Sequence, residues 1–150
     1  MNQASTPVAV PALVLRRTYA APRQRVFDAW TTPDRIAQFF GPGDMTVPEI
    51  TMDVRTGGTY RIVMQRPDGE RLPAIGTYRE VRAPERLSMT WKWEEDDPAD
   101  EVDTLLTLEF NDVPGGTELV LTHEQLRSVE SRDRHAEGWT MILEQLAHAL

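Results

Sequence analysis

Hydrophobic and polar residues change their spacing along the chain, and each spacing predicts a different kind of secondary structure. Residues 13–20 (LVLRRTYA) are rich in large and β-branched side chains, which favours a first strand. In the next segment, APRQRVFDAW, a proline stands at a first helical position and Val26, Phe27 and Trp30 recur at helical spacing. The segment RIAQFF, between a Thr-Pro-Asp turn and a Gly-Pro-Gly turn, predicts a second short helix.

Between Met45 and Glu124 hydrophobic residues alternate with polar ones, which is the period of a half-buried strand. Turn residues such as TGG, PDG and PGG interrupt this alternation at strand-length intervals. Six strands are predicted in this region: MTVPEITMDV, TYRIVMQ, IGTYREV, LSMTWKW, VDTLLTLEF and TELVLTHE. Because short connections join consecutive strands, neighbours must be antiparallel, and the region is predicted to form a meander.

Residues 135–150 (HAEGWTMILEQLAHAL) predict a long amphipathic helix at the end of the chain. Leu143, Leu146 and Leu150 lie within about 40° of Trp139 around the axis of such a helix. The opposite side carries polar residues: Glu137, Thr140, Glu144 and His148. The apolar side must pack on the sheet. A curved sheet around one long helix leaves a wedge between them, and the function depends on whether side chains or a ligand fill that wedge.

Gly138 directly precedes Trp139, the largest residue of this helix. Glycine inside a helix costs about 1 kcal/mol relative to alanine, so its presence needs a reason. It leaves room beside the tryptophan ring for a neighbouring segment or for a ligand. We expect Gly138 to let the start of the helix approach a strand or loop, with Trp139 closing one end of a cavity. Met141 and His148 lie on the outer side, where contact with a partner subunit in a homodimer stays open.

The composition is that of a globular protein, with 40% of the 150 residues hydrophobic and 27% charged. We expect a single domain over residues 11–150 after a flexible tail over residues 1–10. A net charge of −8 disfavours nucleic-acid partners and anionic membranes, which bind concentrated positive charge. No segment reaches the roughly 20 apolar residues of a membrane span. The apolar N-terminal stretch is interrupted by prolines and is not preceded by a basic residue, so a cytoplasmic location without a signal peptide is expected.

Few residues are candidates for catalysis or metal binding. The chain has no cysteine, which excludes thiolate zinc sites and thiol nucleophiles. The pair Gly57-Gly58 lacks the spacing of a phosphate loop, and the acidic run 94–103 lacks the register of a calcium loop, so a turn and a solvated loop are predicted. His123 continues the inward positions of its strand, either as a hydrogen-bonded core histidine or as a polar group in a cavity. No metal or cofactor is expected, and His123 is the only candidate for a catalytic residue.

Five stretches, in this order along the chain, resemble one known family: PRQRVFDAWTTPDRIAQFFGP, DVRTGGTYRIVM, GTYREVRAPERLSMTW, TELVLTHEQL and HAEGW. The family is that of the heat-shock-protein-90 ATPase activator homologue-like proteins, within the START-like (SRPBCC, polyketide-cyclase-like) helix-grip superfamily. The resemblance covers about residues 13–150, although Phe39-Phe40 stand where such proteins often have two tryptophans. It implies an α+β fold of order β-α-α-β6-α, in which a curved antiparallel sheet wraps around the long C-terminal helix and a hydrophobic cavity.

The resemblance leaves three functions open. The first is binding of a small hydrophobic or lipid-like molecule in the cavity, the second a stress-related chaperone cofactor, and the third a cyclase or hydratase that uses His123 with Tyr60 or Tyr78. We expect a binding protein rather than an enzyme, with an apolar molecule, a lipid or a chaperone as partner. The side chains expected to line the cavity are Phe39, Phe40, Tyr60, Ile62, Met64, Tyr78, Met89, Trp91, Trp93, Leu106, Leu108, Phe110, His123, Trp139, Leu143 and Leu146.

Overall fold

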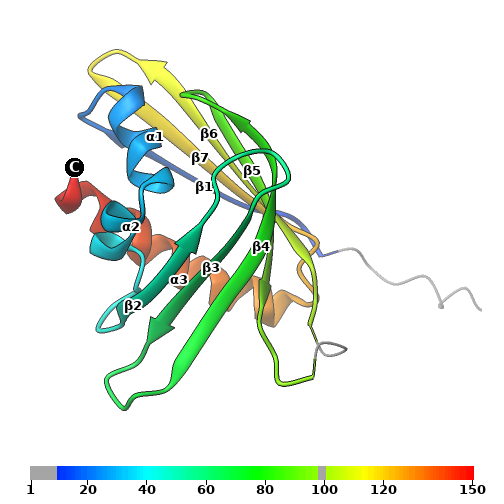
Figure 1. Ribbon diagram of the computed structural model, residues 1–150. Coiled ribbons are helices and arrows are strands. Elements are labelled where there is room, and N and C mark those ends of the chain that lie inside the picture. The colour runs from blue at the N-terminus through cyan, green and yellow to red at the C-terminus, as the bar shows by residue number, and fades with distance from the viewer. Residues whose placement is uncertain (1–9, 98–100) are drawn as a thin grey trace, which may run out of the picture.

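The computed structural model describes residues 10–97 and 101–150 as one antiparallel sheet with three helices (Figure 1). The predicted flexible tail lies outside the described residues up to residue 9, and so does part of the predicted acidic loop. The elements in chain order are β1 (Leu13–Tyr19), α1 (Arg23–Thr31), α2 (Pro33–Phe39), β2 (Thr46–Met52), β3 (Thr59–Gln65), β4 (Arg71–Arg82), β5 (Arg86–Trp93), β6 (Thr104–Val113), β7 (Gly116–Glu124) and α3 (Val129–Ala149).

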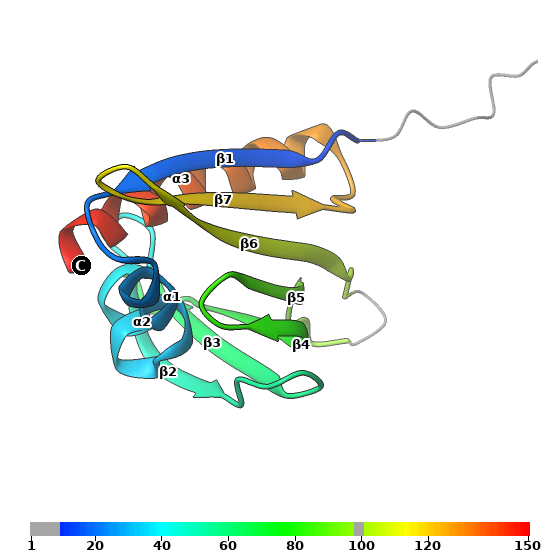
Figure 2. The ribbon, with the colours of Figure 1, turned by 90° about the horizontal axis from the view of Figure 1, so that it is seen from above.

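The seven strands lie in the order β1-β7-β6-β5-β4-β3-β2, which confirms the predicted meander and places β1 beside the last strand. The sheet curves around α3, so that β1 and β7 lie along the helix while β2, β3 and β4 bend away from it (Figures 1 and 2). This is the predicted helix-grip arrangement, in which two short helices follow the first strand.

Two strands extend further into their turns than the alternation predicts. Strand β4 begins at Arg71 rather than near residue 75, because the β3–β4 turn is tight: Gly69 adopts a φ of +95° and Arg71 already pairs with Gln65. Strand β6 continues to Val113, which pairs with Gly116. The turn between β6 and β7 is therefore shorter than the predicted NDVPGG segment, with only Pro114 and Gly115 between the paired residues.

Helix α3 begins at Val129, earlier than the segment 135–150 in which a helix is predicted. The hydroxyl of Ser128 caps it by accepting a hydrogen bond from the backbone N–H of Ser131 at 3.0 Å. The apolar side faces the sheet as predicted, and its buried residues are Trp139, Ile142, Leu143 and Leu146. Within the described part of the chain, no helix is both long enough and apolar enough to cross a membrane.

Aromatic side chains fill the middle of the wedge between α3 and the sheet. The Trp30 ring contacts Phe39 and Phe40 edge-on, with ring centroids 5.2 and 6.0 Å away. Phe40 in turn lies 5.9 Å from Trp91 of β5 and 5.8 Å from Trp139 of α3. Helices α1 and α2 supply much of this cluster, because they sit together at the end of the sheet where α3 ends (Figure 2). These rings are buried and pack against one another.

Candidate functional site

A cavity of about 690 Å³ remains along the N-terminal part of α3, and we call it the α3 cavity. Its helical wall consists of residues spaced three and four apart, which is one face of a helix. These residues are Ser131, Arg134, His135, Gly138, Trp139 and Ile142. At 1.5 Å per residue this face is about 16 Å long, so the cavity is an elongated trough beside the helix.

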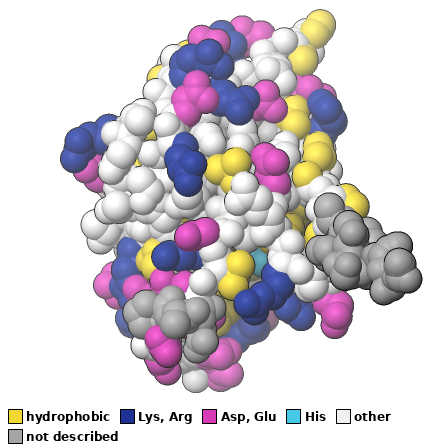
Figure 3. Space-filling model, turned by 90° about the vertical axis from the view of Figure 1, so that its right-hand side faces the viewer, with side chains coloured by type: hydrophobic (Ala, Val, Ile, Leu, Met, Phe, Trp, Pro, Cys, Tyr) yellow, Lys and Arg dark blue, Asp and Glu magenta, His cyan; other side chains and the backbone are white. Residues whose placement is uncertain are grey.

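The opposite wall comes from three segments of chain that are distant in sequence. The β3–β4 hairpin, the end of β5 with the residues after it, and the loop before β2 contribute Met64, Arg66, Glu70, Arg71, Leu72, Pro73, Trp91, Trp93, Glu94, Glu95, Asp96, Pro42 and Met45. The buried residues among them, Met64 and Trp91, are apolar or aromatic, whereas the charged ones are exposed. The trough therefore has an apolar floor and a charged rim. Figure 3 views the molecule from the side of the β5 end, where hydrophobic and histidine side chains reach the surface between charged ones.

Gly138 stands in the middle of the helical wall. A Cβ atom built on it would meet nothing within 4 Å, whereas the expected close approach of a strand or loop would place atoms there. The expectation of a close approach is therefore wrong. The space beside Gly138 belongs to the α3 cavity, next to Trp139, which is 2% exposed.

His123 lies beneath the cavity rather than on its wall. Its side chain is fully buried, and its Nδ1 accepts a hydrogen bond from Trp139 Nε1 at 3.0 Å. The Nε2–H then donates to Thr104 Oγ1 at 2.7 Å, and the Thr104 hydroxyl donates to the Trp91 carbonyl at 2.6 Å. Burial lowers the pKa of His123 to about 3, with a smaller contribution from His135. Both ring nitrogens are engaged, so His123 is a neutral link between α3 and the sheet.

His135 is the histidine that borders the cavity. Its Nε2 accepts a hydrogen bond from Trp93 Nε1 at 3.4 Å, and its Nδ1–H donates to the Ser131 carbonyl at 2.7 Å. Burial lowers the pKa of His135, and the positive charge of Arg134 acts in the same direction, while the bond to Ser131 opposes them. Because the Nδ1 proton is held by a backbone carbonyl, His135 does not activate the Ser131 hydroxyl as a nucleophile.

The predicted cavity residues divide into two groups. Four of them border the α3 cavity: Met64, Trp91, Trp93 and Trp139. The remaining twelve are buried in the core: Phe39, Phe40, Tyr60, Ile62, Tyr78, Met89, Leu106, Leu108, Phe110, His123, Leu143 and Leu146. Sequence reasoning assigned no role to Ser131, Arg134 or His135, although their spacing to Gly138 and Trp139 places all of them on one helical face.

Gln145 attaches the loop before β2 to α3. Its Nε2 donates to the carbonyls of Phe39 and Gly41, both at 2.9 Å, and its Oε1 accepts from the Gly43 N–H at 2.9 Å. The same loop contributes Pro42 and Met45 to the cavity wall. One amide side chain thus fixes the end of the trough that faces away from Arg134.

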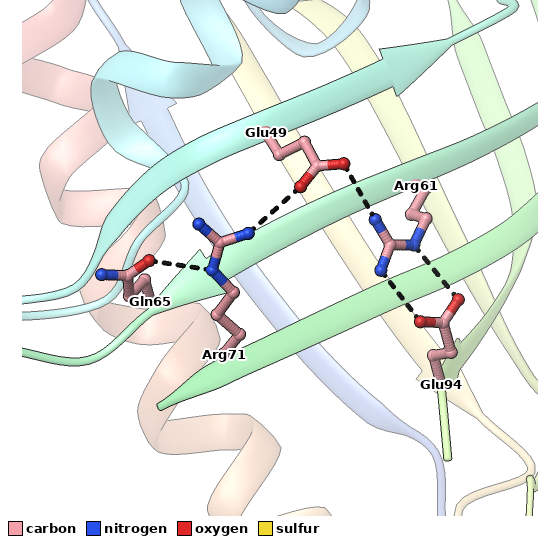
Figure 4. A network of polar contacts seen from close by, with 5 residues as sticks. All are labelled: Glu49, Arg61, Gln65, Arg71 and Glu94. Atoms are coloured by element: carbon pink, nitrogen blue, oxygen red, sulfur yellow. Dashed lines mark hydrogen bonds and ion pairs between the residues drawn. The ribbon is translucent and has the colours of Figure 1, made fainter. Parts of the chain in front are cut away.

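A network of charged groups spans the outer face of the sheet beside the rim (Figure 4). Arg61 of β3 donates to Glu94 at 2.9 Å and to Glu49 of β2 at 3.2 Å, and Arg71 of β4 reaches Glu49 at 3.3 Å. The hydrogen bond from Arg61 lowers the pKa of Glu94. The negative charge of Glu94 is therefore compensated by Arg61, a residue of the sheet. Among the described residues, no group of three or more histidine and acidic side chains has a metal-binding arrangement.

A curved antiparallel sheet that grips a C-terminal helix, with an apolar trough between them, defines the START-like helix-grip class. Residues 20–150 match the model of the family "Activator of Hsp90 ATPase homolog 1-like protein", and the chain belongs to that family. Among curated proteins, none matches this sequence.

Solved structures from several bacteria have the same fold. The AHSA1 protein from Silicibacter pomeroyi is 28% identical, with a TM-score of 0.81, and the match covers 92% of this chain and 96% of that one. A protein from Rhizobium leguminosarum is 26% identical, with a TM-score of 0.80 and 93% of both chains covered. A protein from Chromobacterium violaceum is 23% identical, with a TM-score of 0.81 over 94% of this chain and 98% of that one.

Proposed function

We propose that this protein binds a small hydrophobic or lipid-like molecule in the α3 cavity. The observation that carries the proposal is Gly138, which lies inside a helix and beside open space. Glycine at such a position costs about 0.5–1 kcal/mol relative to alanine. No neighbouring segment occupies the space, so position 138 is left open toward the α3 cavity.

The dimensions and lining of the α3 cavity support the same function. Its volume of about 690 Å³ falls within the range of small-molecule sites. An apolar floor of Met64, Trp91, Trp139 and Ile142 under a charged rim suits a ligand with an apolar body. The aromatic rings near α1 and α2 occupy the other part of the wedge, so the cavity lies along the N-terminal part of α3.

Filling the cavity from Gly138 tests the proposal. The neutral dye N-phenyl-1-naphthylamine fluoresces strongly in apolar surroundings, so we expect saturable emission with the unmodified protein. Gly138→Phe places a ring in the trough and is expected to weaken dye binding about tenfold or more, a loss of about 1.4 kcal/mol. Gly138→Leu is a smaller filling variant and is expected to act in the same direction.

Gly138→Ala is the matched control for these variants. Its Cβ has free space, so dye binding should persist, and the helix should be stabilised by about 0.5–1 kcal/mol. Urea unfolding and circular dichroism verify that each variant is folded. Equal dye binding by the folded Phe and Leu variants would place the dye elsewhere and contradict the proposal.

The family description favours a second function, that of a chaperone cofactor. This function requires that the protein accelerate ATP hydrolysis by the heat-shock-protein-90 chaperone of its own organism. An ATPase assay with and without the protein tests it, with Gly138→Phe included. Acceleration that the filled variant retains would favour a surface role over the cavity.

A further inference from the structure

One hydrogen bond joins the sheet wall of the α3 cavity to its helical wall. The donor is the indole Nε1 of Trp93, at the end of β5, and the acceptor is Nε2 of His135 on α3, at 3.4 Å. Both side chains are half-buried and border the cavity. We call this contact the Trp93–His135 bridge, because it connects the two walls at the cavity itself.

A second pair of rings lies behind the bridge. The ring centroid of Trp91 is 5.5 Å from that of Trp93, and the centroid of His123 is 4.9 Å from that of His135, with both pairs close to perpendicular. Trp91 is 3% exposed and His123 is 0% exposed, so these two rings are closed off from solvent. Packed rings therefore support the bridge from behind, and side chains released from it would move on the cavity side.

The bridge is compatible with only one protonation state of His135. Its Nδ1 lies 2.7 Å from the Ser131 carbonyl oxygen, which can only accept, so the single proton of the neutral imidazole is on Nδ1. Nε2 then offers a lone pair to the Trp93 indole, which can only donate. A second proton on the imidazole would place one N–H group against another and break the bridge.

The surroundings of His135 disfavour that second proton. Burial lowers the pKa of His135, and the positive charge of Arg134 on the same helix acts in this direction too, against the bond to Ser131. A protonated His123 on β7 would also repel it. Glu95 and Asp96, after β5, border the cavity with the opposite charge but are exposed to water. The other charges of the cavity wall are paired: Arg66 with Glu70, Arg71 with Glu49, and Glu94 with Arg61.

We propose that the Trp93–His135 bridge holds the walls of the α3 cavity in position for the ligand, so that binding requires a neutral His135. This inference rests on the proposed binding function and gives both residues a positioning role. The trough keeps its shape while the bridge is intact, whereas acid breaks the bridge and weakens binding. By reciprocal linkage, a bound ligand makes protonation of His135 less favourable.

Dye titrations between about pH 7.5 and about pH 4.5 test the proposal, since this range spans the protonation of most histidines. We expect the dissociation constant of N-phenyl-1-naphthylamine to rise about threefold or more as His135 becomes protonated, as for the loss of one hydrogen bond. Imidazole resonances in NMR spectra follow this protonation, and its midpoint should move to lower pH when the dye is added. Circular dichroism at each pH verifies that the protein is folded.

Matched variants separate the bridge from a general effect of acid. In His135→Gln an amide oxygen replaces the accepting Nε2 and does not titrate, so binding should stay within about twofold and lose its pH dependence. His135→Phe removes the acceptor and Trp93→Phe removes the donor. Each should weaken binding about threefold at neutral pH, and the double variant should weaken it no further, because the same bond is lost. His148→Gln, on the exposed side of α3, should retain the pH dependence.

The outcomes separate the bridge from the binding function on which it rests. A dye affinity that stays constant while His135 titrates, or a pH dependence that survives in His135→Gln, would overturn the bridge and leave the binding function intact. Additive losses in the two Phe variants would also overturn it, because they would indicate independent contacts with the dye. Absence of dye binding at neutral pH, or binding that Gly138→Phe does not reduce, would contradict the binding function itself.

Discussion

At the scale of single residues, neighbouring positions on α3 have opposite roles. Gly138 keeps space open beside the cavity, whereas the indole of Trp139 closes the floor and donates a hydrogen bond to His123. His123 then connects through Thr104 to the backbone of β5. This buried chain of donors is fully satisfied only while His123 remains neutral, because its Nδ1 must accept the indole proton.

Acid should destabilise the protein through His123. Its pKa is about 3 in the folded state against 6.5 for the free side chain, so the unfolded chain binds more protons between these pH values. Stability should therefore fall as the pH drops through this window, by up to about 1.4 kcal/mol per pH unit. His135, whose pKa is also lowered, acts in the same direction. Urea unfolding measured between pH 7 and pH 4, a range of about three units, checks this expectation.

Two variants isolate the contribution of His123. His123→Gln cannot titrate, so the loss of stability between neutral and acid pH should be smaller than in the unmodified protein, even though the variant is less stable throughout. His148→Gln changes an exposed histidine and should leave the pH dependence as it is. An unchanged slope in the His123 variant would show that this residue is not the group that titrates.

At the scale of elements, the α3 cavity depends on contacts between segments that do not touch in sequence. Helix α3 supplies one wall, the β3–β4 hairpin and the end of β5 supply another, and Gln145 holds the loop before β2 in place. Helices α1 and α2 pack aromatic rings into the other end of the wedge. The end of the cavity that faces away from Arg134 is thus bounded by the hydrogen-bonded loop before β2 and by the aromatic rings packed behind it.

Removing the amide of Gln145 should loosen this loop. Gln145→Ala deletes three hydrogen bonds and leaves two carbonyls and one N–H group without their partner, so we expect a loss of about 1–3 kcal/mol of stability. Hydrogen exchange at the Gly43 amide should become faster. Glu144→Ala, on the exposed face of the same helix, should change stability by less than about 0.5 kcal/mol. Unaltered protection of Gly43 in the Gln145 variant would contradict this role.

At the scale of the whole molecule, a ligand in the α3 cavity joins the two halves of the grip. It would contact α3 on one side and the β3–β4 hairpin on the other, so binding and folding are coupled. The N-terminal part of α3 faces this hairpin across the α3 cavity. Ligand binding is therefore expected to stabilise the fold as a whole rather than a single loop.

Thermal unfolding measures this coupling. N-phenyl-1-naphthylamine at about one hundred times its dissociation constant should stabilise the protein by about 2.7 kcal/mol, which raises the Tm by roughly 5–10 °C for a chain of this size. Gly138→Phe should show no such rise at the same concentration, because its cavity is filled. A similar increase of Tm in both proteins would indicate that the dye acts outside the cavity.

The order of the elements, the meander and the apolar side of α3 could all be predicted from the sequence. These features depend on local periodicity: alternation specifies a strand with one buried face, and spacings of three and four specify one face of a helix. The early start of α3 at Val129 and the longer β4 were missed, because a serine cap and a tight turn decide them at single residues. The helical spacing of residues 131–142 was present in the sequence. Hydrophobicity alone does not show, however, that the polar residues at this spacing, Ser131, Arg134 and His135, line a cavity.

Which part of the wedge stays open is decided only by the tertiary structure. Inward-facing side chains such as Tyr78 and Trp91 satisfy the same alternating pattern, yet whether they meet only other rings or also border a cavity depends on the sizes of residues far away in sequence. The same holds for the histidines, since the inward position of His123 is sealed while His135 borders the cavity. Periodicity determines which face of each element is buried; three-dimensional packing determines how completely the buried faces fill the space between them.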